Sequence, residues 1–256
     1  MHLNRSGIAT FFLVIAVALG GSLADAPVQA QDRDAQDKET ALRLASLLRS
    51  ARSVIASNQD LINDPKGGDK GLTGEYVLEL ATKAYQEANG STPLYEGQGD
   101  MEARLIAAQM EAIRQVMAEN QATINTEGLG FKGFVPAVFG RLVNEKFAAL
   151  VGTEARVKVT APTELVRNRK ALPDAWETMI IEDDLMAPDW PKGQVLAELG
   201  ELDGKPAYRV LVPEYYSAGC LACHGEPAGE IDVTGYPKEG GHEGDLGGVI
   251  SISIFR

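Results

Sequence analysis

The two cysteines of this 256-residue chain, Cys220 and Cys223, lie three positions apart, and His224, one of three histidines, follows directly. Cys-x-x-Cys-His is the attachment pattern of c-type haem. Two thiols at this spacing add across the two vinyl groups of one haem, and the adjacent imidazole is held near the iron as its proximal ligand. The sequence therefore predicts one covalent haem c on Cys220 and Cys223, with His224 as a ligand of the metal.

Three other uses of the cysteine pair compete with haem attachment. Structural zinc needs four ligands, so it would have to recruit His242, and a histidine directly beside a cysteine is poor geometry for that site. A thioredoxin-like redox pair opens a helix after a strand, whereas glycine and proline follow this motif at 225–229. A disulfide suits an exported protein but would close a small, strained ring. We favour haem because the spacing, the adjacent histidine and an export signal agree.

The N-terminus has the features of a secretory signal peptide. Arg5 supplies a positive charge, the apolar run 8–20 is too short to span a bilayer comfortably, and a small-residue cleavage site ends at Ala30. We expect cleavage after Ala30, and the alternative is an uncleaved N-terminal anchor. No second long apolar stretch follows, so we expect no stable membrane span in the mature chain.

The formal net charge of −12 argues against nucleic acid and against anionic membrane surfaces as partners. We interpret the acidity as a solvated surface.

The remaining pattern predicts an α+β fold, with helices first and an antiparallel sheet second. Polar residues 31–39 are expected to be flexible. Helical periodicity, with Gly90 as a stop and Pro136 as a start, predicts four helices, and alternation around an Asp203–Gly204 turn predicts strands. The expected helices are 40–57, 73–90, 101–124 and 136–152, and the expected strands are 155–160, two runs within 194–215, and 246–255.

Four stretches together resemble an exported haem-c domain family that was once listed as a domain of unknown function and whose best-known member is cyanobacterial. They are FVPAVFGRLVNEKF, LVRNRKALPDAWE, YYSAGCLACHGEP and GHEGDLGGVISISI, and the resemblance covers about 100–255. It implies a PAS-like fold with one covalent haem and a periplasmic location. The predicted division is a signal peptide at 1–30, an N-terminal helical region at 31–95 and a PAS-like haem-c domain at 96–256.

The second axial ligand departs from the family pattern. Members with a cysteine two residues before the helix-opening proline can use it as that ligand, but here Phe134 occupies the position. Phenylalanine cannot bind iron, so this chain lacks that ligand, and one option is an open site lined by Phe134 and its neighbours. His242, in a glycine-rich segment that can approach a flat ligand closely, is the nitrogen candidate, and the alternative is an exposed loop histidine. The methionine candidates, none of which stands out, are Met101, Met110, Met117, Met179 and Met186.

Arg167 has two competing interpretations. Its guanidinium suits a haem propionate; alternatively, Arg167 and Asn168 fix a turn before a helix that starts near Pro173.

Three functions follow for a haem-c protein of this kind. We place redox or small-ligand sensing first, with a diatomic gas or a redox protein as partner, and a soluble periplasmic electron-transfer cytochrome second. A peroxidase-like enzyme comes last, because it needs a distal acid or base and only His242 offers one.

Overall fold

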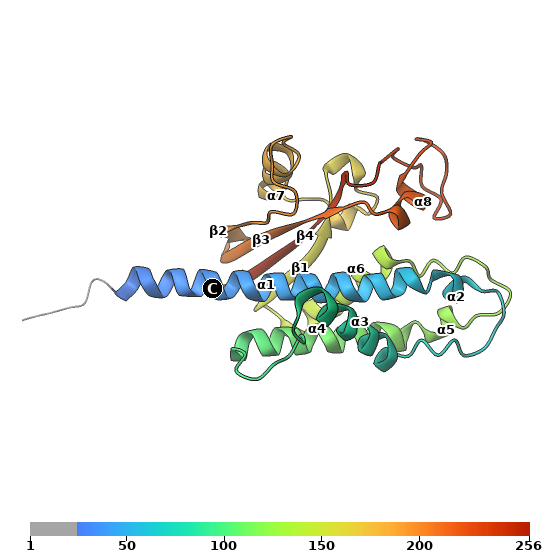
Figure 1. Cartoon of the computed structure of the whole chain (residues 1–256), viewed down its shortest axis with the longest axis horizontal. Coiled ribbons are helices and arrows are strands. Elements are labelled where there is room, and N and C mark those ends of the chain that lie inside the picture. The colour runs from blue at the N-terminus through green and yellow to red at the C-terminus, as the bar shows by residue number, and fades with distance from the viewer. Residues whose placement is uncertain (1–24) are drawn as a thin grey trace, which may run out of the picture.

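The computed structural model describes residues 25–256 and has the predicted α+β class, with helices first and a four-stranded antiparallel sheet second (Figure 1). The signal-peptide apolar run 8–20 lies outside the described residues. Among residues 25–256, no helix is both long and apolar enough to cross a membrane. The first helices are α1 (Asp25–Ser57), α2 (Gln59–Asn63), α3 (Gly74–Asn89), α4 (Asp100–Glu119), α5 (Gln121–Ile124) and α6 (Pro136–Val151).

The ends of the predicted helices follow local sequence signals. The side chain of Thr73 accepts a hydrogen bond from the backbone of Tyr76 at the start of α3, and Gly90 ends that helix in the left-handed conformation. Pro136 occupies the first turn of α6, where its missing N–H costs nothing. The helices predicted at 73–90 and from Pro136 are confirmed.

The expected flexibility of residues 31–39 is wrong, because this segment is a continuous part of α1. Two acidic side chains of the segment have a distant partner: Arg256 Nη2 lies 2.6 Å from Asp34 Oδ1 and 2.6 Å from Asp37 Oδ2. The Asp37 side chain is almost fully buried. A polar segment without apolar periodicity reads as a loop, and only the folded chain brings the C-terminal arginine to it. Ala30, the expected cleavage site, also lies in α1.

The sheet has the order β1-β4-β3-β2 and every pairing is antiparallel. Asp203 and Gly204 both have positive φ, 54° and 72°, as a tight turn between strands requires. The predicted hairpin is therefore confirmed, as are the first and last strands. The strands are β1 (Ala155–Thr160), β2 (Leu196–Leu202), β3 (Lys205–Tyr215) and β4 (Leu246–Phe255).

Helical layers cover both faces of the sheet, which lies between α1 and α6 on one side and α7 (Ala175–Ile180) on the other (Figure 1). Alternation along β4 sends Ile250, Ile252 and Ile254 into the core shared with α1, α3, α4 and α6. On the opposite face, Leu211 and Val249 pack against α7 and the π-helical turn Ile181–Leu185. The first core contains residues from both sides of the expected boundary at 95/96; the division into two domains stays a prediction.

The segment 173–177 (PDAWE) fixes α7 to the sheet. Asp174 and Glu177 form a reciprocal capping box at the start of α7. Arg209 of β3, whose side chain is 3% exposed, places Nη2 2.5 Å from Asp174 Oδ2, and its guanidinium lies 4.1 Å from the centre of the Trp176 ring. These contacts pair the buried Arg209 and anchor the start of α7, which follows Arg167 in the sequence.

Candidate cofactor site

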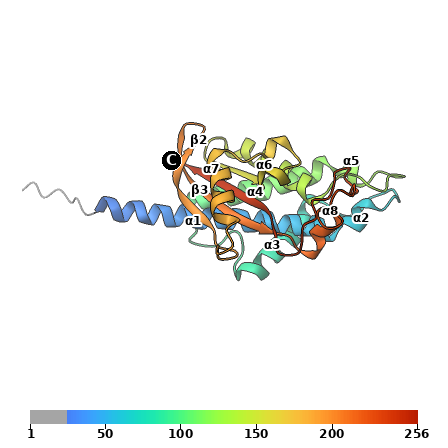
Figure 2. The same cartoon turned by 90° about the horizontal axis from the view of Figure 1, so that it is seen from above.

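The cysteine motif lies just beyond the end of β3, at the opposite end of the sheet from the Asp203–Gly204 turn (Figures 1 and 2). A short 3-10 turn ends at Cys220, and Leu221–His224 form the single helical turn α8. Both cysteines are partly buried free thiols. Among residues 25–256, no group of three or more His, Cys, Asp or Glu side chains is placed so that it could hold a metal ion.

The surroundings of the Cys223 thiol disfavour its thiolate form. Burial raises its pKa, and the neighbouring Asp232 carboxylate raises it further. A reactive cysteine of a redox pair needs a lowered pKa, because the thiolate is the nucleophile.

His224 presents one ring nitrogen to the protein and leaves the other available. Its Nδ1 lies 2.8 Å from Glu239 Oε2. Burial would raise the pKa of Glu239, but hydrogen bonds from Arg167 and His224 outweigh burial and lower it. An ionised Glu239 only accepts, so Nδ1 carries a proton, and in the neutral ring Nε2 is then the lone-pair nitrogen. Metal-bound histidines commonly have this carboxylate support.

The aromatic ring of Tyr216 covers one face of the imidazole. The two ring centres are 5.1 Å apart and the planes are 20° from parallel. Two glycines make room for the phenol: a Cβ added at Gly247 would lie 2.2 Å from Tyr216 Cε1, and one at Gly241 would lie 2.6 Å from Cε2. The sequence suggested that these glycines allow close approach to a flat ligand, but at these two positions the flat group is Tyr216.

The buried phenol oxygen of Tyr216 has no hydrogen-bond partner within residues 25–256, and burial raises the pKa of Tyr216 to about 12. The phenol therefore stays protonated at neutral pH.

Arg167 joins the motif to the loop that follows it. Its Nη2 donates to the carbonyl oxygen of Cys223 at 2.8 Å, Nη1 donates to Asp232 Oδ2 at 2.6 Å, and Nε donates to Glu239 Oε1 at 2.7 Å. Burial would raise the pKa of Asp232, but hydrogen bonds from Thr234 and Arg167 hold it well below its usual range. Arg167 thus holds the motif to the following loop, and we call Arg167 with its partners Asp232, Glu239 and the Cys223 carbonyl the clamp. The pairing of Arg167 with a haem propionate stays a prediction.

Asn168 fixes a turn, as the second interpretation of this segment expected. Its side chain accepts a hydrogen bond from the backbone of Lys170 and caps the short turn Arg169–Ala171.

A family model, Tll0287-like, matches residues 93–254, which is more than half of the chain and includes every residue of the clamp. This chain belongs to the Tll0287-like family. No curated protein and no solved structure matches it. The helices α1 and α3 precede the matched segment.

The other two predicted site residues of this Tll0287-like protein are His242 and Phe134. The His242 side chain is 73% exposed and its Nδ1 lies 3.4 Å from Asp245 Oδ2, although the backbone N–H of the preceding Gly241 donates to the His224 carbonyl at 2.7 Å. Phe134 is buried, with its ring 6.0 Å from that of Phe139 in the helical core. The roles of His242 and Phe134 at the iron stay predictions.

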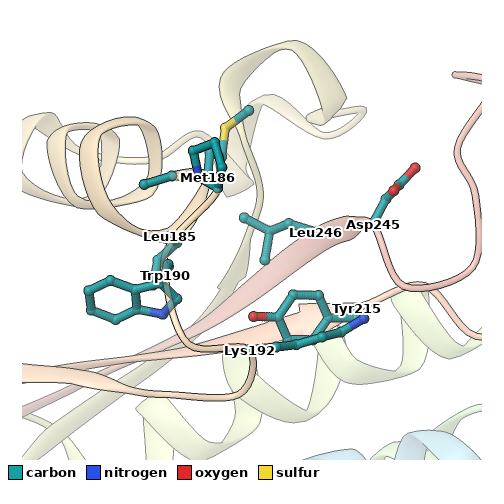
Figure 3. A pocket seen from close by; sticks show the side chains of 9 residues that line it. Leu185, Met186, Trp190, Lys192, Tyr215, Asp245 and Leu246 are labelled. Carbon is teal, nitrogen blue, oxygen red and sulfur yellow. The ribbon is translucent and has the colours of Figure 1, made fainter.

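A separate cavity of about 420 Å³ opens on the α7 face of the sheet (Figure 3). Leu185, Met186 and Trp190 line one side, and Tyr215 and Leu246 line the other. The cysteines and His224 do not line this cavity, so it is distinct from the site at the motif.

Sequence reasoning did not find Glu239, Asp232 or Tyr216. Glu239 lies fifteen residues after His224 in an irregular segment, and its contact with the ring depends on the path of the intervening loop. Only the adjacency of Tyr216 to the motif was a usable signal.

Proposed function

We propose that this Tll0287-like protein is exported to the periplasm and carries one haem c, bound through thioethers at Cys220 and Cys223 and through His224 as the proximal ligand. The observation that carries the proposal is the arrangement of the motif. One free thiol ends the 3-10 turn Ala218–Cys220 and the other lies in the following helical turn Leu221–His224, and the adjacent imidazole has its Nδ1 hydrogen-bonded to Glu239, which leaves Nε2 for a metal. When bound, a haem supplies one-electron exchange and a site for a diatomic gas.

We further propose that the sheet and its flanking helices form a PAS-like fold in which the haem senses redox state or a small ligand. A chain of contacts leads from the motif to α1 and supports this role. Glu214, two residues before Tyr216, accepts hydrogen bonds from Arg49 at 2.7 Å and from Arg52 at 2.8 Å. A movement of Tyr216 against His224 would therefore shift Glu214 and change its ion pairs with Arg49 and Arg52 of α1.

The sensing role is tested on protein matured with its leader beside the haem-c maturation machinery. Carbon monoxide is added to the reduced protein, and amide hydrogen exchange is followed in α1. We expect carbon monoxide to bind and to change exchange near Arg49 and Arg52, with the change reduced in Glu214→Gln. The matched control is Glu145→Gln, which removes an exposed partner of Arg141 on α6. Binding with identical exchange in α1 contradicts the sensing role.

Electron transfer is the second candidate, and an exposed apolar surface favours it. Ile231 and Val233 are each 62% exposed, in the loop that directly follows the motif. Exposed apolar side chains beside a redox centre suit a transient docking surface. Fast electron exchange with other cytochromes, together with a ferrous iron that does not take up carbon monoxide, would favour a carrier over a sensor.

A further inference from the structure

The Glu239 carboxylate contacts both His224 and Arg167, and the charges of Glu239 and Arg167 have opposite electrostatic effects on the His224 ring. Its Oε2 lies 2.8 Å from His224 Nδ1, while Arg167 donates to Oε1 from Nε at 2.7 Å and to Oε2 from Nη2 at 3.0 Å. The three side chains are between 16% and 30% exposed, so water screens these interactions only partly.

The carboxylate changes the imidazole as a donor. A negative charge that accepts the Nδ1 proton makes the ring more electron-rich, and an electron-rich axial ligand stabilises ferric iron more than ferrous iron. Arg167 works in the opposite direction, because two of its N–H groups draw charge from the same carboxylate. The neutral ring of Tyr216 stacks on the imidazole and adds no charge to this balance.

We propose that Glu239 is a positioning residue that fixes the Nδ1-protonated tautomer of His224 and lowers the reduction potential of the iron, and that Arg167 partly offsets this effect. The inference rests on the proposed haem c at Cys220, Cys223 and His224. It adds to that proposal two residues with opposite and measurable effects. A purely structural role for the pair would not give potential shifts of opposite sign.

The test compares the reduction potential of the haem-loaded parent protein with that of Glu239→Gln. The amide keeps the size of the side chain and removes its charge. We expect the ratio of ferrous to ferric protein at a fixed electrode potential to rise roughly tenfold, which is about 59 mV for a one-electron couple. The matched control is Glu230→Gln, which removes the same charge from the same loop, where Glu230 is half-exposed and paired with Lys238. We expect this control to stay close to the parent.

Arg167→Gln supplies the opposite arm and is expected to lower the potential. Because this change also leaves buried Asp232 without its partner, Glu239→Asp is a second variant that keeps the charge and should stay nearer to the parent than Glu239→Gln does. The iron–histidine stretching vibration, measured in the ferrous protein after photodissociation of carbon monoxide, should fall in Glu239→Gln. This vibration reports donor strength directly and not stability.

The outcomes separate the two proposals. Covalent haem in all variants, with equal potentials and equal iron–histidine frequencies in the parent, Glu239→Gln and Glu230→Gln, overturns the role of Glu239 and leaves the proposed function standing. A parent protein that matures without covalent haem overturns the proposed function, and this inference fails with it. Potentials that shift upward in Glu239→Gln and downward in Arg167→Gln support the inference.

Discussion

The core between the helices and the sheet is stabilised by different forces from those that hold the site loops, residues 216–245. In the core, side chains such as Phe147, Leu44 and Ile252 are fully buried and apolar, and burial of apolar area supplies the stability. In the site loops, charged hydrogen bonds around Arg167 connect segments that are far apart in the sequence. A packed core tolerates little movement, whereas a clamp of ion pairs can loosen locally and still leave the fold intact.

The largest effect is expected from a core substitution. Phe147→Ala removes a fully buried ring from α6 and should lower the free energy of unfolding by about 3–5 kcal/mol, because it loses apolar burial and leaves a cavity. Urea unfolding followed by circular dichroism measures this. The control on the same helix is Leu150→Ala, which is 46% exposed and should change stability by less than about 0.5 kcal/mol. Equal losses in the two variants would refute the placement of the core.

A break in the clamp should give a smaller and more local effect. Arg167→Leu leaves the buried Asp232 carboxylate unpaired. It should lower the free energy of local opening of the site loops by about 3 kcal/mol, which is near the low end for a buried pair because Arg167 is 19% exposed. Amide hydrogen exchange should speed up in residues 220–240 and stay unchanged in α4. The control Arg141→Leu removes an exposed ion pair and should leave both regions as they are. Protection lost equally in α4 and the site loops would contradict a local clamp.

A crowding substitution tests the packing around Tyr216. Gly247→Ala places a methyl group 2.2 Å from the Tyr216 ring, so the ring or the start of β4 must shift, at a cost of about 1–3 kcal/mol. The matched control is Gly219→Ala, where the nearest heavy atom is 4.0 Å away. Thermal unfolding compares the two. A Gly247→Ala variant as stable as Gly219→Ala would show that Tyr216 is not confined as described.

The smallest effect concerns acid stability at the α7 side of the sheet. Burial would raise the pKa of Asp174, but hydrogen bonds from the Glu177 backbone and Arg209 lower it below the ordinary value of 3.8. The folded pKa is the lower one, so the stabilisation is present above pH 3.8 and is lost as the pH falls through the folded value. On acidification we expect the free energy of unfolding to fall by about 1 kcal/mol through this group, and this part of the loss should be absent in Asp174→Asn.

Urea unfolding at neutral pH and at a pH near 3 measures this contribution. Asp183→Asn, at an exposed residue of the following turn, should keep the acid dependence of the parent. An Asp174→Asn variant with unchanged acid dependence would contradict the assignment.

The sequence predicted the core far better than the site loops. Alternation in LGGVISISIF and the Asp203–Gly204 pair are local signals, and the strands and the hairpin turn follow from them. Local signals gave the wrong prediction for residues 31–39, because the partner of Asp34 and Asp37 is Arg256, which is far away in the sequence.

At the site, the Cys-x-x-Cys-His spacing indicated the chemistry but not its support. Arg167 was noticed, yet its bonds to Asp232, Glu239 and the Cys223 carbonyl depend on the paths of two irregular loops. No local pattern encodes such a path. Glu239, whose Oε2 lies 2.8 Å from His224 Nδ1, therefore emerged only from the folded chain.

Covalent attachment of one haem to the motif can be tested with a pyridine haemochrome on the denatured, matured protein. We expect one haem per chain with both vinyl groups saturated, and one vinyl left unsaturated in Cys220→Ala or Cys223→Ala. A control variant that changes neither cysteine, such as Ser217→Ala, should give the parent spectrum. A parent protein without covalent haem, under conditions in which a control c-type cytochrome matures, would contradict the account and leave Cys220 and Cys223 as ordinary thiols.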